Sequence, residues 1–161
     1  MNRKVELSEE NYDLLDEVIH QLCEQGRLLE EQNAMQHGST SVYEHSVNVA
    51  YKSLLLVENY RLPVDKQSLV RGALLHDYFL YDWHEKDGGH RLHGFRHPAF
   101  ALYNASKDFS LNRKERNIIA RHMFPLTVLP PRCLEAWVVC FVDKYCAFSE
   151  TMGDGRIQWE R

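Results

Sequence analysis

Imidazoles and a carboxylate recur at helical spacing on stretches of apolar residues, on the side of each expected helix that would face a core. The chain has nine histidines in 161 residues. Histidine is the commonest metal ligand in proteins and the usual proton carrier near neutral pH. The polar residues that share an apolar face with their helical neighbours are His45, His76, His122 and Asp143. They come from four separate expected helices, so a site between helices is indicated.

Asp143 gives the strongest indication of chemistry. It shares its helical stripe with Ala136, Val139 and Ala147, and an unpaired carboxylate buried there would cost several kcal/mol. Lys144 does not offset that cost, because adjacent residues of a helix point apart. Each histidine alone is more typical of a hydrogen-bonded core residue. A metal ion held by Asp143 and by histidines of other helices would explain all of them together.

The elements that must position these side chains are all helices. Apolar patterns of helical period predict six of them, at residues 8–31, 41–60, 65–80, from 97, from 112 and at 132–151. Their starts carry N-cap residues at Ser8, Ser41, Asp65 and Asn112, and His97-Pro98 places proline in a first turn. The polar, glycine-containing stretch 82–96 is predicted to be a loop and a lid. The predicted fold class is all-α.

The length of the chain suits one compact domain over residues 1–161. Residues 41–150 are expected to form the ligand-bearing core. Residues 1–35 are expected to form a helix that covers this core. The same helix could instead pair two subunits, so a homodimer stays open.

Charge and hydropathy exclude several classes of protein. The net charge is −4, from 19 basic and 23 acidic residues, so no basic face for duplex nucleic acid is expected. The longest apolar run, 136–142, is too short to cross a bilayer, and the N-terminus turns acidic where a signal peptide would be apolar. The four cysteines show no CxxC pair and no zinc-finger spacing. We expect a cytoplasmic protein with no membrane or duplex nucleic-acid partner.

Three segments carry histidine and aspartate in a specific order. His45 lies in VYEHSVNVA, the pair His76-Asp77 in LVRGALLHDYFLYDWH, and Asp143 in WVVCFVDKYCA. This set, within roughly residues 41–150, resembles the HD-domain superfamily of metal-dependent phosphohydrolases. The resemblance implies a helical HD-type fold and a metal site with His45, His76, Asp77 and Asp143 as ligands.

Two further histidines extend the resemblance. His97 in GFRHPAFAL and His122 in IIARHMFPLT are similar to the additional histidines of two-metal HD proteins. That resemblance implies two divalent ions bridged by Asp77 and a ligand set of His45, His76, Asp77, His97, His122 and Asp143. Mixed nitrogen and oxygen donors suit iron or manganese, with zinc, nickel and magnesium as alternatives. His93 competes with His97 for this role, and we favour His97 because it is expected to begin a helix.

One position departs from the family pattern. Many two-metal HD phosphohydrolases carry a lysine three residues after the His-Asp pair, where it meets substrate phosphate, and Leu80 stands there in this chain. The Gly-Tyr-Pro element of one HD group is also missing, so cyclic di-GMP is not assigned. The remaining candidates for phosphate contacts are Lys86, Arg91, Arg96 and Arg121. Each of them alone is more typical of a solvated surface charge.

The resemblance implies hydrolysis of a phosphate ester or anhydride in a small phosphorylated molecule, with a nucleotide as the first candidate. A hydroxide held at the ions that Asp77 bridges would attack phosphorus. A loop acid would then protonate the leaving oxygen. The candidates for that acid are His84, Glu85, His90 and His93.

Two other functions stay open. Some HD-fold proteins, resembling inositol or organophosphonate oxygenases, use the same ligand order for di-iron oxygen chemistry. A regulatory or binding module with a vestigial metal site would fit the leucine at position 80. Against that module, six potential ligands exceed the four closed ligands of a structural site.

Overall fold

The computed structural model describes residues 6–37, 39–78 and 93–153, and these fold almost entirely into helices, which confirms the predicted all-α class. The helices are α1 (Glu9–Gln25), the 3-10 helix η1 (Leu28–Asn33), α2 (Val42–Tyr60), α3 (Lys66–Leu75), α4 (His93–Asp108), α5 (Arg113–Arg121) and α6 (Leu134–Thr151). A short hairpin pairs β1 (Met35–His37) with β2 (Thr40–Ser41) in antiparallel fashion. None of the helices in the described residues is both long and apolar enough to cross a membrane.

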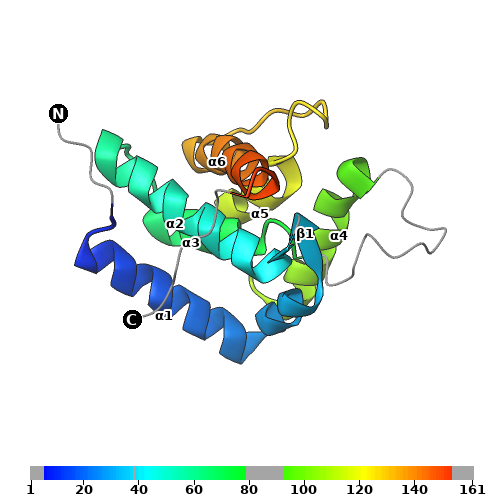
Figure 1. Cartoon of the computed structure of the whole chain (residues 1–161), viewed down its shortest axis with the longest axis horizontal. Coiled ribbons are helices and arrows are strands. Elements are labelled where there is room, and N and C mark those ends of the chain that lie inside the picture. The colour runs from blue at the N-terminus through cyan, green and yellow to red at the C-terminus, as the bar shows by residue number, and fades with distance from the viewer. Residues whose placement is uncertain (1–5, 38, 79–92, 154–161) are drawn as a thin grey trace.

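The helices α2 and α3 lie in the middle of the molecule, with α1 on one side and α6 on the other (Figure 1). α5 packs against α3, α4 and α6. The core includes apolar side chains without solvent exposure, among them Leu54, Leu69, Leu74, Ile118 and Val139. Because α3 contacts α2, α5 and α6, side chains at its C-terminal end can meet those of all three neighbours.

The N-caps form as the sequence predicts. In each, the cap side chain accepts a hydrogen bond from the amide three residues later: Ser8 from Asn11, Ser41 from Glu44, Asp65 from Ser68 and Asn112 from Glu115. The caps of α2 and α5 are complete capping boxes, since the glutamate also accepts from the cap amide. These local bonds fix where the helices that lead to the site begin.

The first helix ends at Gln25 rather than at residue 31 as predicted. Gly26 lies against the ring of Phe109 with no room for a side chain. The amide of Arg27 donates to the hydroxyl of Tyr78 at 2.7 Å. A tertiary hydrogen bond therefore replaces a helical one, and η1 and the hairpin follow in place of the predicted helix end and loop.

The third helix is also shorter than predicted. α3 ends at Leu75, although the apolar pattern continues to Leu80, and His76 and Asp77 form the turn after it. The amide of Tyr78 donates to the carbonyl of Leu75 at 3.2 Å and closes that turn. Periodicity could not show this stop, because a buried turn continues the apolar pattern of the helix.

The fourth helix starts earlier than predicted, at His93 instead of His97. Residues 93–96 are therefore helical and not part of the predicted 82–96 loop. Pro98 lies inside the helix rather than in its first position, where the sequence placed it. Its missing N–H removes one main-chain hydrogen bond near the start of α4, a loss that a helix tolerates best close to its N-terminus.

The close contact between α3 and α5 gives a stability prediction. A Cβ on Gly72 would collide with Cδ1 of Ile118 and lie 3.0 Å from its Cβ. Alanine normally stabilises a helix by up to about 1 kcal/mol over glycine, whereas overpacking costs about 1–3 kcal/mol. We expect Gly72→Ala to destabilise the protein by about 1–2 kcal/mol, measured by chemical denaturation.

Ile118→Val supplies the control, because it removes the colliding Cδ1. The double variant Gly72→Ala with Ile118→Val should be more stable than the sum of the two single changes predicts. Additive losses would show that α3 and α5 accommodate the extra methyl group in another way.

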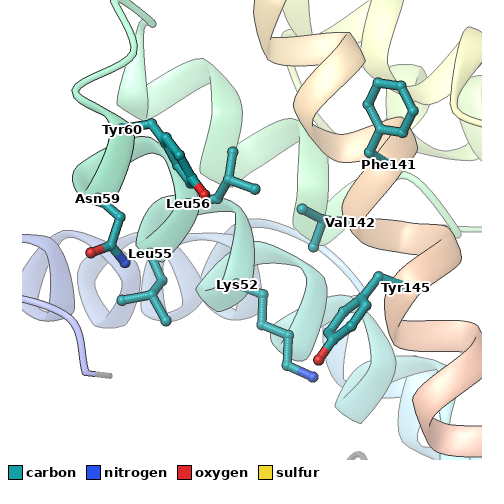
Figure 2. Close-up of a pocket in the computed structure, with 8 residues that line it drawn as sticks. All are labelled: Lys52, Leu55, Leu56, Asn59, Tyr60, Phe141, Val142 and Tyr145. Carbon is teal, nitrogen blue, oxygen red and sulfur yellow. The ribbon is translucent and has the colours of Figure 1, made fainter. Parts of the chain in front are cut away.

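A groove of about 510 Å³ opens between α2 and α6 (Figure 2). Its walls are mostly apolar and comprise Lys52, Leu55, Leu56, Asn59, Tyr60, Phe141, Val142 and Tyr145. The α2 residues come from the C-terminal half of that helix, whereas His45 lies in its first turn. The groove and the histidine cluster are therefore separate places in the fold.

Candidate metal centre

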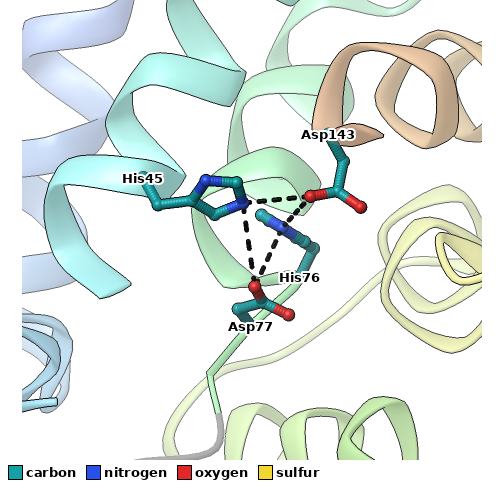
Figure 3. Close-up of side chains that lie close together, drawn as sticks. All are labelled: His45, His76, Asp77 and Asp143. Atoms are coloured by element: carbon teal, nitrogen blue, oxygen red, sulfur yellow. Dashed lines mark hydrogen bonds and ion pairs between the residues drawn. The ribbon is translucent and has the colours of Figure 1, made fainter. Parts of the chain in front are cut away.

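Four predicted ligands from α2, α6 and the end of α3 point toward one another (Figure 3). Nε2 of His45 and Nε2 of His76 lie 3.0 and 3.4 Å from Oδ1 of Asp143. Oδ2 of Asp77 lies 3.3 Å from Nε2 of His76 and 3.8 Å from Nε2 of His45. All four are buried, and each offers an atom within 4.8 Å of the others, so the group could hold a metal ion.

A second group forms on the other side of Asp77. Its Oδ1 lies 3.1 Å from Nε2 of His97 and 3.3 Å from Nε2 of His122, and these two nitrogens are 2.8 Å apart. All three residues are buried, and the group could hold a further ion. His97 lies here although it does not begin α4; His93 does. Asp77 thus turns one oxygen toward each group.

His76 and His122 are held in the same way. Each directly follows a helix, as the C-cap of α3 or α5. Their Nδ1 atoms lie 2.6 and 2.9 Å from the carbonyls of Ala73 and Ile119, three residues earlier. Because a carbonyl only accepts, Nδ1 donates in both, and Nε2 is the nitrogen that faces the cluster.

Two buried polar atoms of the cluster have no hydrogen-bond partner within the described residues. They are Nε2 of His76 and Oδ1 of Asp77. A buried polar atom without a partner costs free energy. A cation in the first group would contact Nε2 of His76, and one in the second group would contact Oδ1 of Asp77. Both costs would then be removed, so the residues present fit divalent metal ions.

His45 is oriented by residues that the sequence analysis missed. Its Nδ1 lies 2.8 Å from Oε2 of the buried Glu150, whose Oε1 accepts a bond from Nδ2 of Asn48 at 3.0 Å. This is the arrangement in which a carboxylate fixes the tautomer of a metal-binding histidine. Glu150 lies seven residues after Asp143 on α6, so the helical period could have placed it on the same face.

Replacing Glu150 by glutamine should weaken metal binding without removing a ligand. The amide keeps the shape but loses the charge that holds Nδ1 of His45. We expect the metal affinity to fall about 10- to 100-fold, measured by competition with a chromophoric chelator. Glu10→Gln on the exposed start of α1 is the matched control. An unchanged affinity in Glu150→Gln would show that Glu150 does not position His45.

Residues before α2 also reach the cluster, which sequence periodicity gave no sign of. Nε2 of Gln36 in β1 donates to Oδ2 of Asp77 at 2.5 Å and is buried. Glu31 in η1 is completely buried, and neither of its oxygens has a hydrogen-bond partner among the described residues. Burial and then the charge of Asp77 raise its pKa well above the usual range. This segment therefore does more than cover the core.

The carboxylates of the cluster stay ionised in the metal-free protein, and His45 stays protonated. Burial disfavours charge on Asp143, but the hydrogen bond from His45 and the nearby ring of His76 hold its pKa well below the usual range. Burial would lower the pKa of His45, yet the bonds to Asp143 and Glu150 raise that pKa to about 9. Burial lowers the pKa of His122. The first group thus carries a proton where a metal would bind.

Metal binding should therefore release protons. A ligand nitrogen must lose its proton to bind a cation, and the raised pKa of His45 means that a proton is present below about pH 9. The affinity of the first group for a metal ion should increase as the pH rises toward about 9 and should level off above that value. Calorimetric titration at pH 7 in buffers of different ionisation enthalpy should show at least about one proton released. A heat independent of the buffer would contradict this.

The structure describes two of the four predicted phosphate contacts. Arg96 is exposed in the first turn of α4, directly before His97. The guanidinium of Arg121 donates to the carbonyl of Pro130 at 2.8 Å and so ties down the segment after α5. His93 begins α4, but its side chain lies outside the described residues. Outside them as well lie Leu80, His84, Glu85, Lys86, His90 and Arg91.

Comparison with known proteins agrees with the arrangement of the clusters. The HD domain family model matches residues 42–147, well over half of the chain. The match runs from the first residue of α2 into α6 and contains every residue of both groups. Comparison with curated proteins finds no match, and comparison with solved structures finds none either. The resemblance noted in the sequence is confirmed, and the chain belongs to the HD domain family.

Proposed function

We propose that the protein is a metal-dependent phosphohydrolase that uses two divalent ions to cleave a phosphate ester or anhydride of a small molecule. The observation that carries this proposal is the position of Asp77, whose two oxygens face two separate groups of imidazoles. One ion would be held by His45, His76 and Asp143, the other by His97 and His122, and both by Asp77. Iron or manganese suits this donor set, with zinc, nickel and magnesium as alternatives.

When bound, the ions supply positive charge that polarises a phosphoryl oxygen and acidifies a water molecule. Asp77 favours its ionised form in the metal-free protein: burial opposes charge on it, but the neighbouring imidazoles hold its pKa well below the usual range. Gln36 fixes one oxygen of Asp77 by its hydrogen bond. Burial of the whole cluster excludes bulk water, which strengthens the electrostatic interactions within it.

We also propose which side chains contact the substrate. Arg96 is an exposed cation directly before His97, and this exposure lets it meet a phosphate beside that ligand. Arg121 already donates to a carbonyl, so it would have to leave that bond first. Lys86 and Arg91 remain candidates for phosphate binding. His84 and His93 remain candidates for the acid that protonates the leaving oxygen.

The first test is metal content and phosphate release on protein purified without a chelator or a histidine tag. About two equivalents of metal per chain are expected, with hydrolysis of a nucleotide or other phosphate ester that stops when a chelator removes the metal. A panel of mono- and polyphosphates would identify the substrate class. A protein that binds metal but releases no phosphate from any member would contradict the hydrolase proposal.

The same donor set supports a second candidate function, a di-iron oxygenase. Four imidazoles and two carboxylates, of which Asp77 would bridge the two ions, suit iron in oxygen chemistry as well as in hydrolysis. Oxygen uptake that requires ferrous iron would favour this candidate, since hydrolysis consumes no oxygen. Protein that binds no metal after incubation with iron or manganese would instead leave a binding module.

We also infer a cytoplasmic location. Its support is that all four cysteines are free thiols, as is usual where the environment is reducing. A small phosphorylated molecule is the proposed partner, without duplex nucleic acid or a membrane.

A further inference from the structure

The outward face of α6 is apolar along most of the helix. Phe141, Tyr145, Phe148 and Met152 follow one another at intervals of four, three and four residues, and all are exposed. That spacing places them on one side of the helix. The opposite side carries Asp143 and Glu150 in the metal centre. We call the outward set of Phe141, Tyr145, Phe148 and Met152 the α6 stripe.

Two polar side chains beside the α6 stripe, Lys144 and Thr151, already have partners within the chain. The ammonium of Lys144 donates to the carbonyls of His122 and Cys140 at 2.8 and 3.2 Å. The hydroxyl of Thr151 donates to the carbonyl of Ala147 at 2.7 Å. These side chains would not need new partners if water were removed from this face.

The exposed area of the stripe and of the apolar residues near it approaches one side of a standard protein interface. Its four members are 65, 61, 69 and 69% exposed, which at about 200 Å² per side chain gives roughly 500 Å². Tyr60 beside the groove and Leu134 on the same helix face, 51 and 39% exposed, bring the total to roughly 700 Å². A standard interface buries about 800 Å² on each partner. The largest apolar patch on a typical monomer is about 300–600 Å² and is often functional, so this face is a candidate for an interface.

We propose that the α6 stripe is a homodimer interface, formed with the same stripe of a second copy of the chain around a two-fold axis. A two-fold interface requires a surface that is complementary to itself. None of the four members of the stripe carries a charge, so they set no like charges against each other, and the nearest cation of α2, Lys52, lies over the Tyr145 ring. The one exposed charge on α6, Lys144, is directed to backbone carbonyls rather than to a partner of opposite charge.

The groove between α2 and α6 could receive side chains of the second copy. Phe141 and Tyr145 belong both to the stripe and to the groove wall (Figure 2). If two copies of α6 run antiparallel about an axis near Tyr145, residue 148 of one copy lies opposite residue 142 of the other. Phe148 would then lie at the edge of the other copy's groove. The ammonium of Lys52, 5.0 Å from the centre of the Tyr145 ring, holds that wall in place.

The test is the mass of the full-length protein in solution, measured by sedimentation velocity from low micromolar to high micromolar concentration. We expect twice the chain mass of 19.0 kDa at the higher concentrations. Phe148→Glu should give the monomer throughout that range, because it buries two unpaired carboxylates in the interface. Tyr103→Glu is the matched control: Tyr103 is 59% exposed on α4, away from the stripe, and its replacement should leave the dimer intact.

Cross-linking tests the arrangement of the two copies. A two-fold axis near Tyr145 brings this residue close to its counterpart in the other copy. Tyr145→Cys should therefore form a disulfide between copies under mild oxidation, which requires Cβ atoms about 4 Å apart. Tyr103→Cys should form none. Circular dichroism and metal content should be unchanged in Phe148→Glu, which separates loss of pairing from loss of fold.

Two results would overturn the proposal. A wild-type protein that is monomeric at every concentration would show that the stripe does not pair two copies of the chain. A Phe148→Glu variant that stays dimeric would place the interface elsewhere, for example on α1. In either case the metal centre would be unaffected, because the stripe and the ligands lie on opposite sides of α6.

Discussion

Replacing Asp77 by asparagine is expected to abolish activity and to reduce bound metal from about two equivalents to one or fewer. The two oxygens of Asp77 face His76 on one side and His97 and His122 on the other. Asparagine has one oxygen and an NH₂ group, and the NH₂ group cannot bind a cation. At least one group therefore loses the oxygen donor that Asp77 supplies. Turnover should fall by about a thousandfold or more, measured on the best substrate of the panel with saturating metal.

The matched control for this variant is Asp13→Asn on the exposed face of α1, which should keep both metal content and rate. Circular dichroism should show that Asp77→Asn still folds, since all other helix contacts remain. Two tightly bound equivalents in Asp77→Asn would show that the carboxylate does not bridge the groups. Full activity would remove the proposed mechanism altogether.

His97→Ala is expected to empty one group and leave the other filled. The group formed by Asp77, His97 and His122 has three donors, and the loss of His97 leaves two. The other group keeps all four of its donors. Metal content should fall to about one equivalent, and the loss of one ion's charge stabilisation should slow turnover by about a hundredfold to a thousandfold.

The control for His97→Ala is His20→Ala, because His20 is an exposed histidine on α1 that pairs with Glu24. It should change neither metal content nor rate. His122→Ala should give the same metal content and rate as His97→Ala, since both rings belong to the same three-donor group and their Nε2 atoms are 2.8 Å apart. If one equivalent is bound in the wild type and these variants do not alter it, the site is the four-ligand one, and His97 and His122 would contact substrate instead.

The helices and their inward polar residues could be predicted from the sequence because both depend on local rules. Capping side chains and the helical period act over a few residues, so the starts of α2, α3 and α5 follow from Ser41, Asp65 and Asn112. Ends set by tertiary contacts could not be predicted in this way. The stop after α1 depends on the hydroxyl of Tyr78, which lies 51 residues further along the chain.

The residues of the candidate site likewise include some that could be predicted from local sequence and some that could not. The residue types and order of the two groups could be predicted from the sequence, and the structure brings all six side chains together. Glu150, Gln36 and Glu31 were missed, because their roles arise from contacts across the fold. Glu150 meets His45 from 105 residues away, and Gln36 meets Asp77 from 41. The helical period places Glu150 on the face of Asp143, but no local pattern shows that it contacts His45 or that Gln36 contacts Asp77.

The helix α6 shows what the sequence determined and what only the tertiary structure decided. The sequence determined that Asp143 shares a face with Ala136 and Val139, and that face is buried. It could not separate the rest of this apolar helix into core and surface, since Phe141 and Phe148 are as hydrophobic as the buried residues. Hydrophobicity fixes which residues favour burial, but the number of neighbours that can pack around one helix decides which of them achieve it. The packing of α2, α3 and α5 around one side of α6 leaves the aromatic side facing outward.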